Sequence, residues 1–145
     1  WDGDYEYETG TQNGHGIQAL GAGVEYILDR GVERIAEAEK RLMGILYDGL
    51  SEIQGVTVYG EKGRNLGPVL SMNLKGLRPS ELAYILQNGY ETVVRAGFHC
   101  APLIHQAMGT EEQGTVRVSI SALTEEQEVL QFLEILREIA AAAEN

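Results

Sequence analysis

One short segment of this 145-residue chain brings together several side chains that could do chemistry. The segment Arg95-Ala96-Gly97-Phe98-His99-Cys100-Ala101-Pro102 holds the only cysteine, and His105 follows close behind. Positively charged or hydrogen-bonding neighbours increase the ionised fraction of a thiol, and the thiolate is the nucleophilic form. Cys100, with Arg95 and His99 beside it, is therefore a candidate nucleophile. The alternative is a buried, inert thiol, because free cysteine is among the residue types most often buried.

Two other uses of these side chains fit the spacing less well. Neighbouring residues of an extended segment point to opposite sides, so His99 could meet the Cys100 thiol only through a turn. One cysteine and three histidines, the others being His15 and His105, do not have the spacing of a structural zinc site. We therefore expect no metal.

Arg117 is a second candidate, in the middle of the alternating segment Thr115-Val116-Arg117-Val118-Ser119. In a strand, Val116 and Val118 would point to one face and Arg117 to the other. If the valines face the core, Arg117 is either a solvated surface residue or, where its face borders a cleft, a two-pronged ligand for a carboxylate.

A third candidate is the loop Glu8-Thr9-Gly10-Thr11-Gln12-Asn13, which precedes the first predicted helix. Its hydroxyl and backbone N–H groups could bind an anion such as phosphate. Clusters of glycine, threonine and asparagine are also ordinary loop residues, so both interpretations stay open.

Apolar periodicity and turn residues predict the elements that must position these side chains. Helices are predicted from Ile17 to Gly31, from Val32 to Gly55, from Pro79 to Gly89, from Leu103 to Met108, and after Thr124, whose Thr-x-x-Gln pattern is typical of a capping box. Strands are predicted over 56–59, 69–74, 92–95 and 115–121. The predicted helices and strands alternate irregularly and the loops between strands are short. This favours an α+β fold, in which helices cover one side of a small, mostly antiparallel sheet, over a doubly wound sheet.

Composition excludes several classes of function. The chain has 22 acidic and 11 basic residues, for a net charge of −11, so neither nucleic acid nor an acidic membrane surface is an expected partner. Its length suits one domain. A single cysteine cannot form an internal disulfide, and no apolar run is long enough to span a bilayer. We therefore expect a cytoplasmic location.

Four segments, in this order, resemble the C-terminal part of class V aminotransferases of the cysteine desulfurase and selenocysteine lyase type. They are Tyr7-Glu8-Thr9-Gly10-Thr11-Gln12-Asn13, Gly21-Ala22-Gly23-Val24-Glu25-Tyr26-Ile27, the cysteine segment over 95–102, and Gly114-Thr115-Val116-Arg117-Val118-Ser119. The cysteine segment is the most specific of them. It resembles the subgroup in which a short Arg-x-Gly-x-His-Cys segment presents the nucleophile.

The resemblance implies a pyridoxal 5'-phosphate enzyme that takes sulfur from L-cysteine. In that family the active-site thiolate attacks the substrate sulfur, leaving an enzyme persulfide and L-alanine. The resemblance assigns the thiolate to Cys100 and binding of the substrate carboxylate to Arg117. It places Arg95 and His99 beside the substrate, with Arg95 shaping the thiol loop.

The resemblance also implies a homodimer, in which Gly10 and Thr11 reach the cofactor phosphate across the interface, and a sulfur-acceptor protein as a possible partner. The lysine that would anchor the cofactor is missing, because Lys40, Lys62 and Lys75 lack the flanking histidine and small residues of such a site. We therefore expect residues 1–145 to be the C-terminal small domain of a larger enzyme, with its dimer-interface loop and helix, and to be inactive alone.

Two departures from the family pattern leave the substrate open. Phe98 stands where the family often has a second histidine, and residues 122–124 read Ala-Leu-Thr where it often has Tyr-Asn-Thr. Another class V aminotransferase or a selenocysteine lyase therefore remains an alternative. A non-catalytic acidic module that docks a partner or carries sulfur is the alternative from a different class.

Overall fold

The computed structural model of the chain describes residues 10–64 and 67–143. It divides into two compact units, residues 1–35 and 36–145, which are considered separately. None of the described helices is long and apolar enough to cross a membrane.

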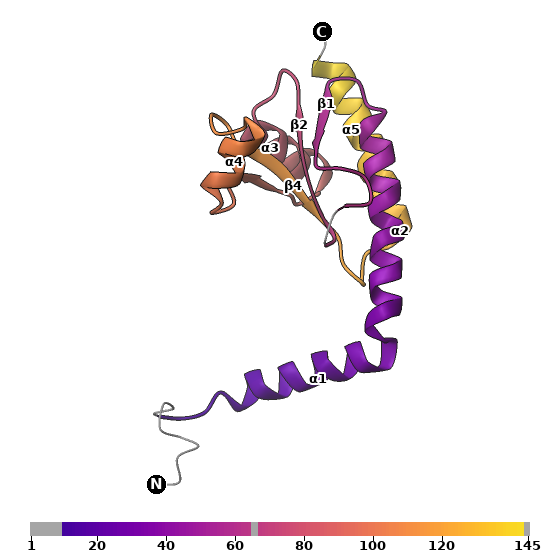
Figure 1. Cartoon of the computed structure of the whole chain (residues 1–145), viewed down its shortest axis with the longest axis vertical. Helices are drawn as coiled ribbons and strands as arrows, with labels where there is room; N and C mark the ends of the chain where they lie inside the picture. Colours follow the sequence, from indigo (N-terminus) through magenta and orange to yellow (C-terminus); the bar gives the residue numbers. More distant parts are fainter. Residues whose placement is uncertain (1–9, 65–66, 144–145) are drawn as a thin grey trace. The chain divides into compact units, whose positions relative to one another are not determined.

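The first unit contains helix α1, Gly14–Arg30 (Figure 1). Its N-terminus is capped by Asn13, whose side-chain oxygen accepts a hydrogen bond from the Gly16 N–H at 3.0 Å. At the other end, the N–H of Gly31 donates to the carbonyl of Ile27 at 2.8 Å. The first predicted helix is thus confirmed, although no residue of α1 is buried within this chain.

The second unit holds a four-stranded sheet and most of the helices. In chain order the elements after α1 are α2 (Val32–Ser51), β1 (Val56–Tyr59), β2 (Val69–Leu74), α3 (Pro79–Tyr90), β3 (Arg95–Gly97), α4 (Pro102–Met108), β4 (Thr115–Ser119) and α5 (Glu126–Ala143). The strand order is β1-β2-β4-β3, and every neighbouring pair is antiparallel. The predicted α+β fold is confirmed.

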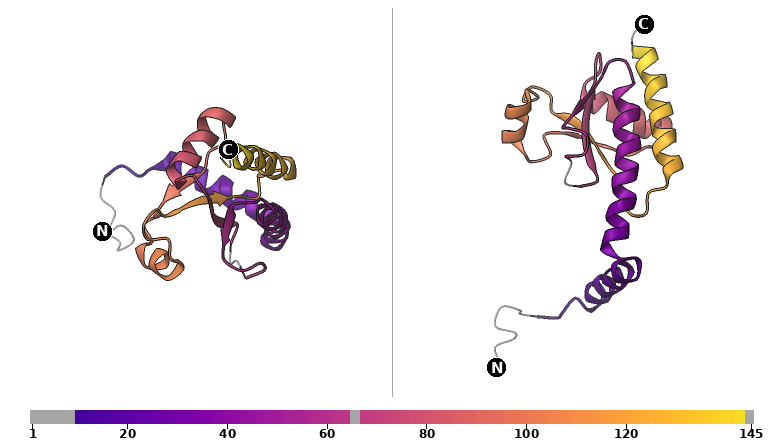
Figure 2. Two further views of the ribbon diagram at one scale, coloured as in Figure 1. Left: turned by 90° about the horizontal axis from the view of Figure 1, so that it is seen from above. Right: turned by 45° about the vertical axis from the view of Figure 1, so that its right-hand side comes forward.

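One face of the sheet packs on helices and forms the hydrophobic core. Figure 2 shows α3 and α5 on the opposite side of the sheet from α4, with α2 running beside α5. The core combines apolar residues of both central strands with those of three helices: Leu70, Met72, Leu74, Val116, Val118, Leu42, Leu46, Leu50, Leu82, Leu86, Phe132, Leu133 and Leu136. Gly49 lets α2 and α5 approach closely, since an added Cβ there would lie 2.3 Å from the Leu133 side chain. Among the described helices of the second unit, α4 is the one that lies on the other face of the sheet (Figure 2).

The third strand differs from its prediction. β3 spans Arg95–Gly97 rather than 92–95, and β4 ends at Ser119 rather than at residue 121. The N–H of Thr92 donates to the carbonyl of Leu86 at 3.0 Å, so Thr92 completes the end of α3 instead of joining the sheet. The β-propensity of residues 92–95 correctly predicted a strand near this position, but the pairing with β4 determines where the strand begins and ends.

The predicted capping box at the start of the last helix is also wrong. The Thr124 hydroxyl oxygen accepts from the N–H of Ser121 at 3.0 Å, which forms a turn before the helix. The Glu128 carboxylate accepts from the N–H of Glu125 at 2.8 Å, so the side chain that reaches back lies one position later than predicted.

Candidate active site

A row of side chains crosses the sheet on the face away from the core. Strand register places Tyr59 of β1 opposite Ser71 of β2, Ser71 opposite Arg117 of β4, and Arg117 opposite Arg95 of β3. Directly opposed residues of antiparallel strands lie on the same face. Four strands therefore contribute to one polar surface that contains both predicted arginines.

A cavity of about 340 Å³ lies on this polar face. It is bordered by strand residues, by the cysteine turn and by α4: Tyr59, Ser71, Thr115, Arg117, His99, Ala101, Ile104 and Met108. A larger hollow of about 540 Å³ lies beside Arg78 and the loop before β4, but neither Cys100 nor Arg117 borders it. Arg117 and His99 line the smaller cavity together, and Cys100 lies between two of its lining residues, His99 and Ala101, without lining it itself.

Arg117 lies on the cavity side of β4, while both neighbouring valines are buried in the core. Its Nε atom is buried and has no hydrogen-bond partner among the described residues. A buried donor without a partner costs free energy, about 1–3 kcal/mol and more for a charged group. Arg117 is half-buried and borders a cavity, which favours the second of the two interpretations, a ligand for a carboxylate.

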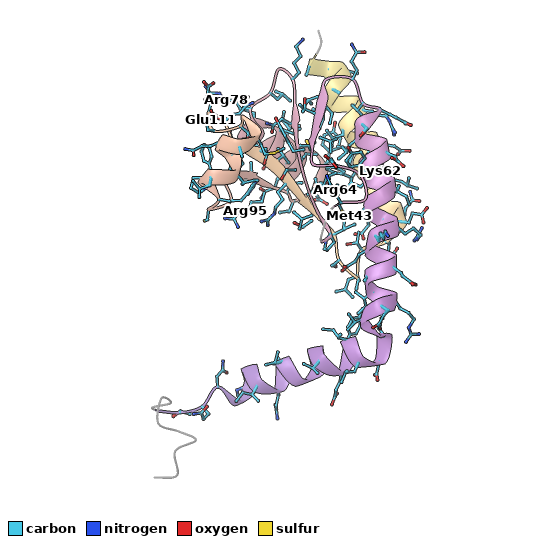
Figure 3. The ribbon with its side chains drawn as sticks, in the orientation of Figure 1. Met43, Lys62, Arg64, Arg78, Arg95 and Glu111 are labelled. Carbon is cyan, nitrogen blue, oxygen red and sulfur yellow. The ribbon has the colours of Figure 1, made fainter. Side chains whose placement is uncertain are left out.

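Arg95 stands directly across from Arg117 on the edge strand β3 and is exposed (Figure 3). Two like charges in opposed positions of neighbouring strands repel each other. Neither guanidinium makes an ion pair within the described residues. An anion bound beside them would relieve this repulsion.

Cys100 lies in a tight turn between β3 and α4 and is exposed. The N–H of Ala101 donates to the carbonyl of Phe98 at 2.9 Å and closes the turn. The two central residues, His99 and Cys100, have positive φ values of 52° and 59°, the signs of a type I′ turn. The alternative of a buried, inert cysteine is wrong, and the turn that a contact between His99 and the thiol would need is present.

This turn is held in an uncommon conformation. Positive φ is disfavoured for residues other than glycine and costs about 1–3 kcal/mol per residue. Neither central residue is a glycine, so the surrounding structure must stabilise them. At the base of the turn, an added Cβ on Gly114 would lie 2.5 Å from the Gly97 carbonyl, so Gly114 needs the close approach that glycine allows.

His99 has a defined orientation at the cavity edge. Its Nε2 lies 3.2 Å from the carbonyl oxygen of Thr115, which can only accept, so Nε2 carries the proton. Nδ1 is then a bare acceptor, buried and without a partner among the described residues. Partial burial lowers the pKa of His99 and the charges of Arg117 and Arg95 lower it further, against the opposing effect of the Thr115 carbonyl. His99 is therefore favoured in its neutral form.

Of the other predicted site residues in the second unit, Arg95 and Cys100 are not among those that line the cavity. Gly10 and Thr11 belong to the first unit, where both are exposed, while residues 8 and 9 of the predicted anion loop lie outside the described residues. Their role toward a phosphate stays a prediction.

The three lysines also lie elsewhere. Lys62 pairs with Asp48 at 2.5 Å on the α2 side of the molecule (Figure 3), and neither Lys40 nor Lys75 borders the cavity. None of the three lysines is therefore among the residues that line the cavity. The described residues also contain no cluster of metal-ligating side chains.

Sequence reasoning missed the contributions of β1 and β2 to this face. Tyr59 and Ser71 border the cavity, and Asn73 donates to the carbonyl of Gly114 at 3.0 Å and so ties β2 to the start of β4. The signal was present in the alternation of polar Ser71 and Asn73 with apolar Leu70 and Met72.

The chain is similar to known cysteine desulfurases over most of its length. The family model for class-V aminotransferases matches residues 2–132. A probable cysteine desulfurase of Methanothermobacter thermautotrophicus is 34% identical over 136 residues, which cover 93% of this chain and 34% of that protein. One from Pyrococcus abyssi is also 34% identical over 136 residues, covering 92% of this chain and 32% of that protein.

A solved cysteine desulfurase structure also matches this chain over nearly its whole length. The apo structure of the cysteine desulfurase from Thermococcus onnurineus matches with a TM-score of 0.85 and 35% sequence identity, covering 96% of this chain and 34% of that one. The chain thus spans about a third of the length of the curated relatives it matches. With the match to the family model and these relatives, the chain belongs to the class V aminotransferase family.

Proposed function

We propose that residues 1–145 act as the thiol-bearing small domain of a pyridoxal-phosphate-dependent cysteine desulfurase. The proposal is supported by relatives that are described as cysteine desulfurases and by the third of their length that this chain spans. The remaining part of such an enzyme would bind the cofactor, because no lysine of this chain borders the cavity. Alone, the chain is expected to be inactive.

One observation carries the proposal: the turn that exposes the Cys100 thiol and an arginine with an unused donor meet at one cavity. His99 and Ala101, the two neighbours of Cys100, line it together with Arg117. A free amino acid offers both a carboxylate for a guanidinium and a reactive side chain for a nucleophile. An amino acid with a sulfur atom in its side chain is therefore a substrate that uses both groups.

In the proposed reaction Arg117 binds the substrate carboxylate and orients the substrate sulfur toward Cys100. The Cys100 thiolate attacks that sulfur, a sulfur–sulfur bond forms, and the bond between sulfur and the substrate Cβ breaks. The carbon fragment keeps the electron pair of that bond, takes up a proton at Cβ and leaves as L-alanine, while Cys100 is left as a persulfide. When bound by the rest of the enzyme, pyridoxal phosphate supplies the electron sink for this cleavage. We propose His99, the residue before Cys100, as the proton acceptor, because its Nδ1 has no hydrogen-bond partner among the described residues.

The exposed position of Cys100 also supports transfer of the sulfur to another molecule. A persulfide at this turn would be open to attack by the thiolate of an acceptor protein, which is how sulfur atoms pass between cysteines. We further propose that Gly10 and Thr11, just before the N-terminus of α1, contact the cofactor phosphate from a second subunit. A loop before a helix N-terminus suits an anion.

The test uses the protein translated from its complete gene and loaded with pyridoxal phosphate. With Cys100→Ser we expect sulfide release from L-cysteine to fall to the uncatalysed rate, because serine cannot form the persulfide. The change in cofactor absorption on adding L-cysteine should persist, since substrate binding does not need the thiol. Sulfide release equal to the unmodified enzyme would overturn the proposal. Faster turnover of L-selenocysteine than of L-cysteine would favour a selenocysteine lyase instead.

A further inference from the structure

His105 is the most deeply buried ionisable side chain near the cysteine turn, with 4% of its surface exposed. It lies on α4, and both of its ring nitrogens have partners. Nδ1 is 2.7 Å from the hydroxyl of Thr110, and Nε2 is 3.1 Å from the carbonyl oxygen of Phe98. Neither the proposed sulfur transfer nor substrate binding uses this residue, so its burial and its two bonds need another reason.

The partners of His105 indicate which ring nitrogen carries the hydrogen in the neutral ring. A carbonyl oxygen can only accept, so the Nε2 atom facing Phe98 carries the hydrogen. In the neutral ring Nδ1 is then the acceptor, and the Thr110 hydroxyl donates to it. Thr110 is itself 3% exposed, and its N–H donates to the His105 carbonyl at 2.9 Å. The ring is therefore held on both sides in one orientation.

The carbonyl that His105 binds belongs to the turn that carries the thiol. The same Phe98 oxygen accepts the N–H of Ala101, the bond that closes the turn around His99 and Cys100. The His105 ring also meets the Phe98 ring edge to face, with 5.4 Å between their centroids. With two consecutive non-glycine residues at positive φ, this turn persists only if its ends are held in place. His105 holds one end, and the bond from His99 to Thr115 holds its centre.

We propose that His105 is a positioning residue for the sulfur-transfer step: its Nε2–H fixes the Phe98 carbonyl and so keeps the Cys100 turn in the conformation that presents the thiol. The inference rests on the proposed function for its catalytic consequence. Its structural part, the dependence of the turn on this hydrogen bond, can be tested without any enzyme activity.

The structural test follows hydrogen exchange of the Ala101 amide in the 145-residue chain. His105→Leu keeps a side chain of similar size but removes the donor, and His105→Gln keeps an N–H donor at the end of the side chain. We expect the leucine variant to speed exchange at Ala101 by about tenfold, with β2 amides unchanged, and the glutamine variant to stay close to the original chain. Gln106→Leu, at an exposed position of the same helix, is the matched control and should change neither.

The catalytic test measures sulfide release by the complete enzyme. With His105→Leu we expect kcat to fall about 10–100-fold with little change in KM, because a misplaced nucleophile slows the chemical step rather than binding. His105→Gln should recover most of the rate. Equal losses in the leucine and glutamine variants, or exchange at Ala101 that His105→Leu does not alter, would overturn the inference.

One outcome separates this inference from the proposed function. If the unmodified enzyme releases no sulfide, the proposed function fails, and the exchange at Ala101 still decides whether His105 holds the turn.

A second variant covers the case in which His105→Leu does not fold. Thr110→Val then takes its place, because it removes the hydroxyl that orients Nδ1 and leaves the His105 ring in position. A smaller increase in Ala101 exchange is then expected, and its absence counts against the inference.

Discussion

The two faces of the sheet are built from the same strands but have opposite chemistry. On β4, Val116 and Val118 are buried among the helices, while Arg117 between them borders a cavity with an unused donor. On β2, Leu70 and Met72 belong to the core, and Ser71 faces the cavity. Strand alternation thus divides the residues by function: one set stabilises the fold and the other is available to a ligand.

The division explains how the candidate site can be built on so small a unit. The core face contains three helices and a continuous apolar cluster, whereas among the described residues of this unit the seven-residue helix α4 and the cysteine turn lie on the cavity face. Groups on the cavity face keep unsatisfied donors, opposed positive charges and a strained turn, each of which lowers stability. The core must offset these costs, so substitutions on the two faces should affect different measurements.

The largest effect on folding is expected at the core face. Met72→Ala removes a side chain that is fully buried, and we expect the free energy of unfolding to fall by about 2–5 kcal/mol. Ser71→Ala is the matched control, because Ser71 directly precedes Met72 and faces the cavity. We expect it to change the free energy of unfolding by about 0.5 kcal/mol or less. Denaturant unfolding of both variants measures the difference. Similar losses for the two would contradict the division between the faces.

A second effect on folding concerns the base of the cysteine turn. Gly114→Ala places a Cβ 2.5 Å from the Gly97 backbone at a residue with φ of 75°, and we expect a loss of roughly 2–4 kcal/mol. Gly109→Ala has a similar φ of 67° but open space around the new Cβ, so only the conformational cost of about 1–2 kcal/mol should remain. Thermal or denaturant unfolding measures both variants. If Gly114→Ala and Gly109→Ala lower the free energy of unfolding equally, the close approach of the Gly114 and Gly97 backbones does not contribute to stability.

Local patterns predicted the core side of this fold well. The ranges of β1 and β2 matched their predictions residue for residue, since β-branched and apolar residues alternate there and Gly60 and Lys75 lie beyond them. β3 was misplaced because Thr92 and Val93 have high β-propensity, whereas the strand begins at Arg95, where the pairing with β4 starts. Long-range pairing decides the limits of an edge strand, and a single sequence does not reveal the partner.

Part of the candidate site was also predicted from local sequence patterns. Alternation placed Arg117 opposite the core, but only the fold shows that a cavity borders that face. The exposure of Cys100 could not be derived, because it depends on positive φ values at two residues whose types give no turn signal. The role of His105 was equally hidden, since its partners Phe98 and Thr110 are brought to it by the turn of the chain around α4.

A smaller effect is expected from a substitution on the cavity face, and it should appear as weaker binding of the substrate. Arg117→Ala in the complete enzyme should raise KM for L-cysteine by about 10–100-fold, because a charge-assisted hydrogen bond contributes roughly 1.5–3 kcal/mol. Arg64→Ala, at an exposed arginine paired with Glu61, is the matched control and should leave KM unchanged. Steady-state kinetics of sulfide release distinguish the two. A fall in kcat with KM unchanged would contradict a carboxylate-binding role.

The smallest effect is a pH dependence of stability that comes from His99. Its pKa is lowered in the folded chain, chiefly by burial and further by the positive charges of Arg117 and Arg95, against the opposing effect of the Thr115 carbonyl. Between that lowered pKa and the ordinary histidine pKa of about 6.5, the unfolded chain binds a proton that the folded chain does not. His99 therefore makes the fold less stable as the pH falls through this window, and the loss levels off below the folded pKa.

His99→Gln removes this titration while keeping an N–H that can reach the Thr115 carbonyl. We expect the stability lost by the original chain between about pH 7.5 and pH 5 to exceed that lost by the variant, with the two curves parallel at higher pH. Denaturant unfolding at several pH values measures it. A larger loss in the variant would mean that His99 is stabilised in its charged form. The cavity face would then hold a net negative environment, and its two arginines could not be the groups that dominate it.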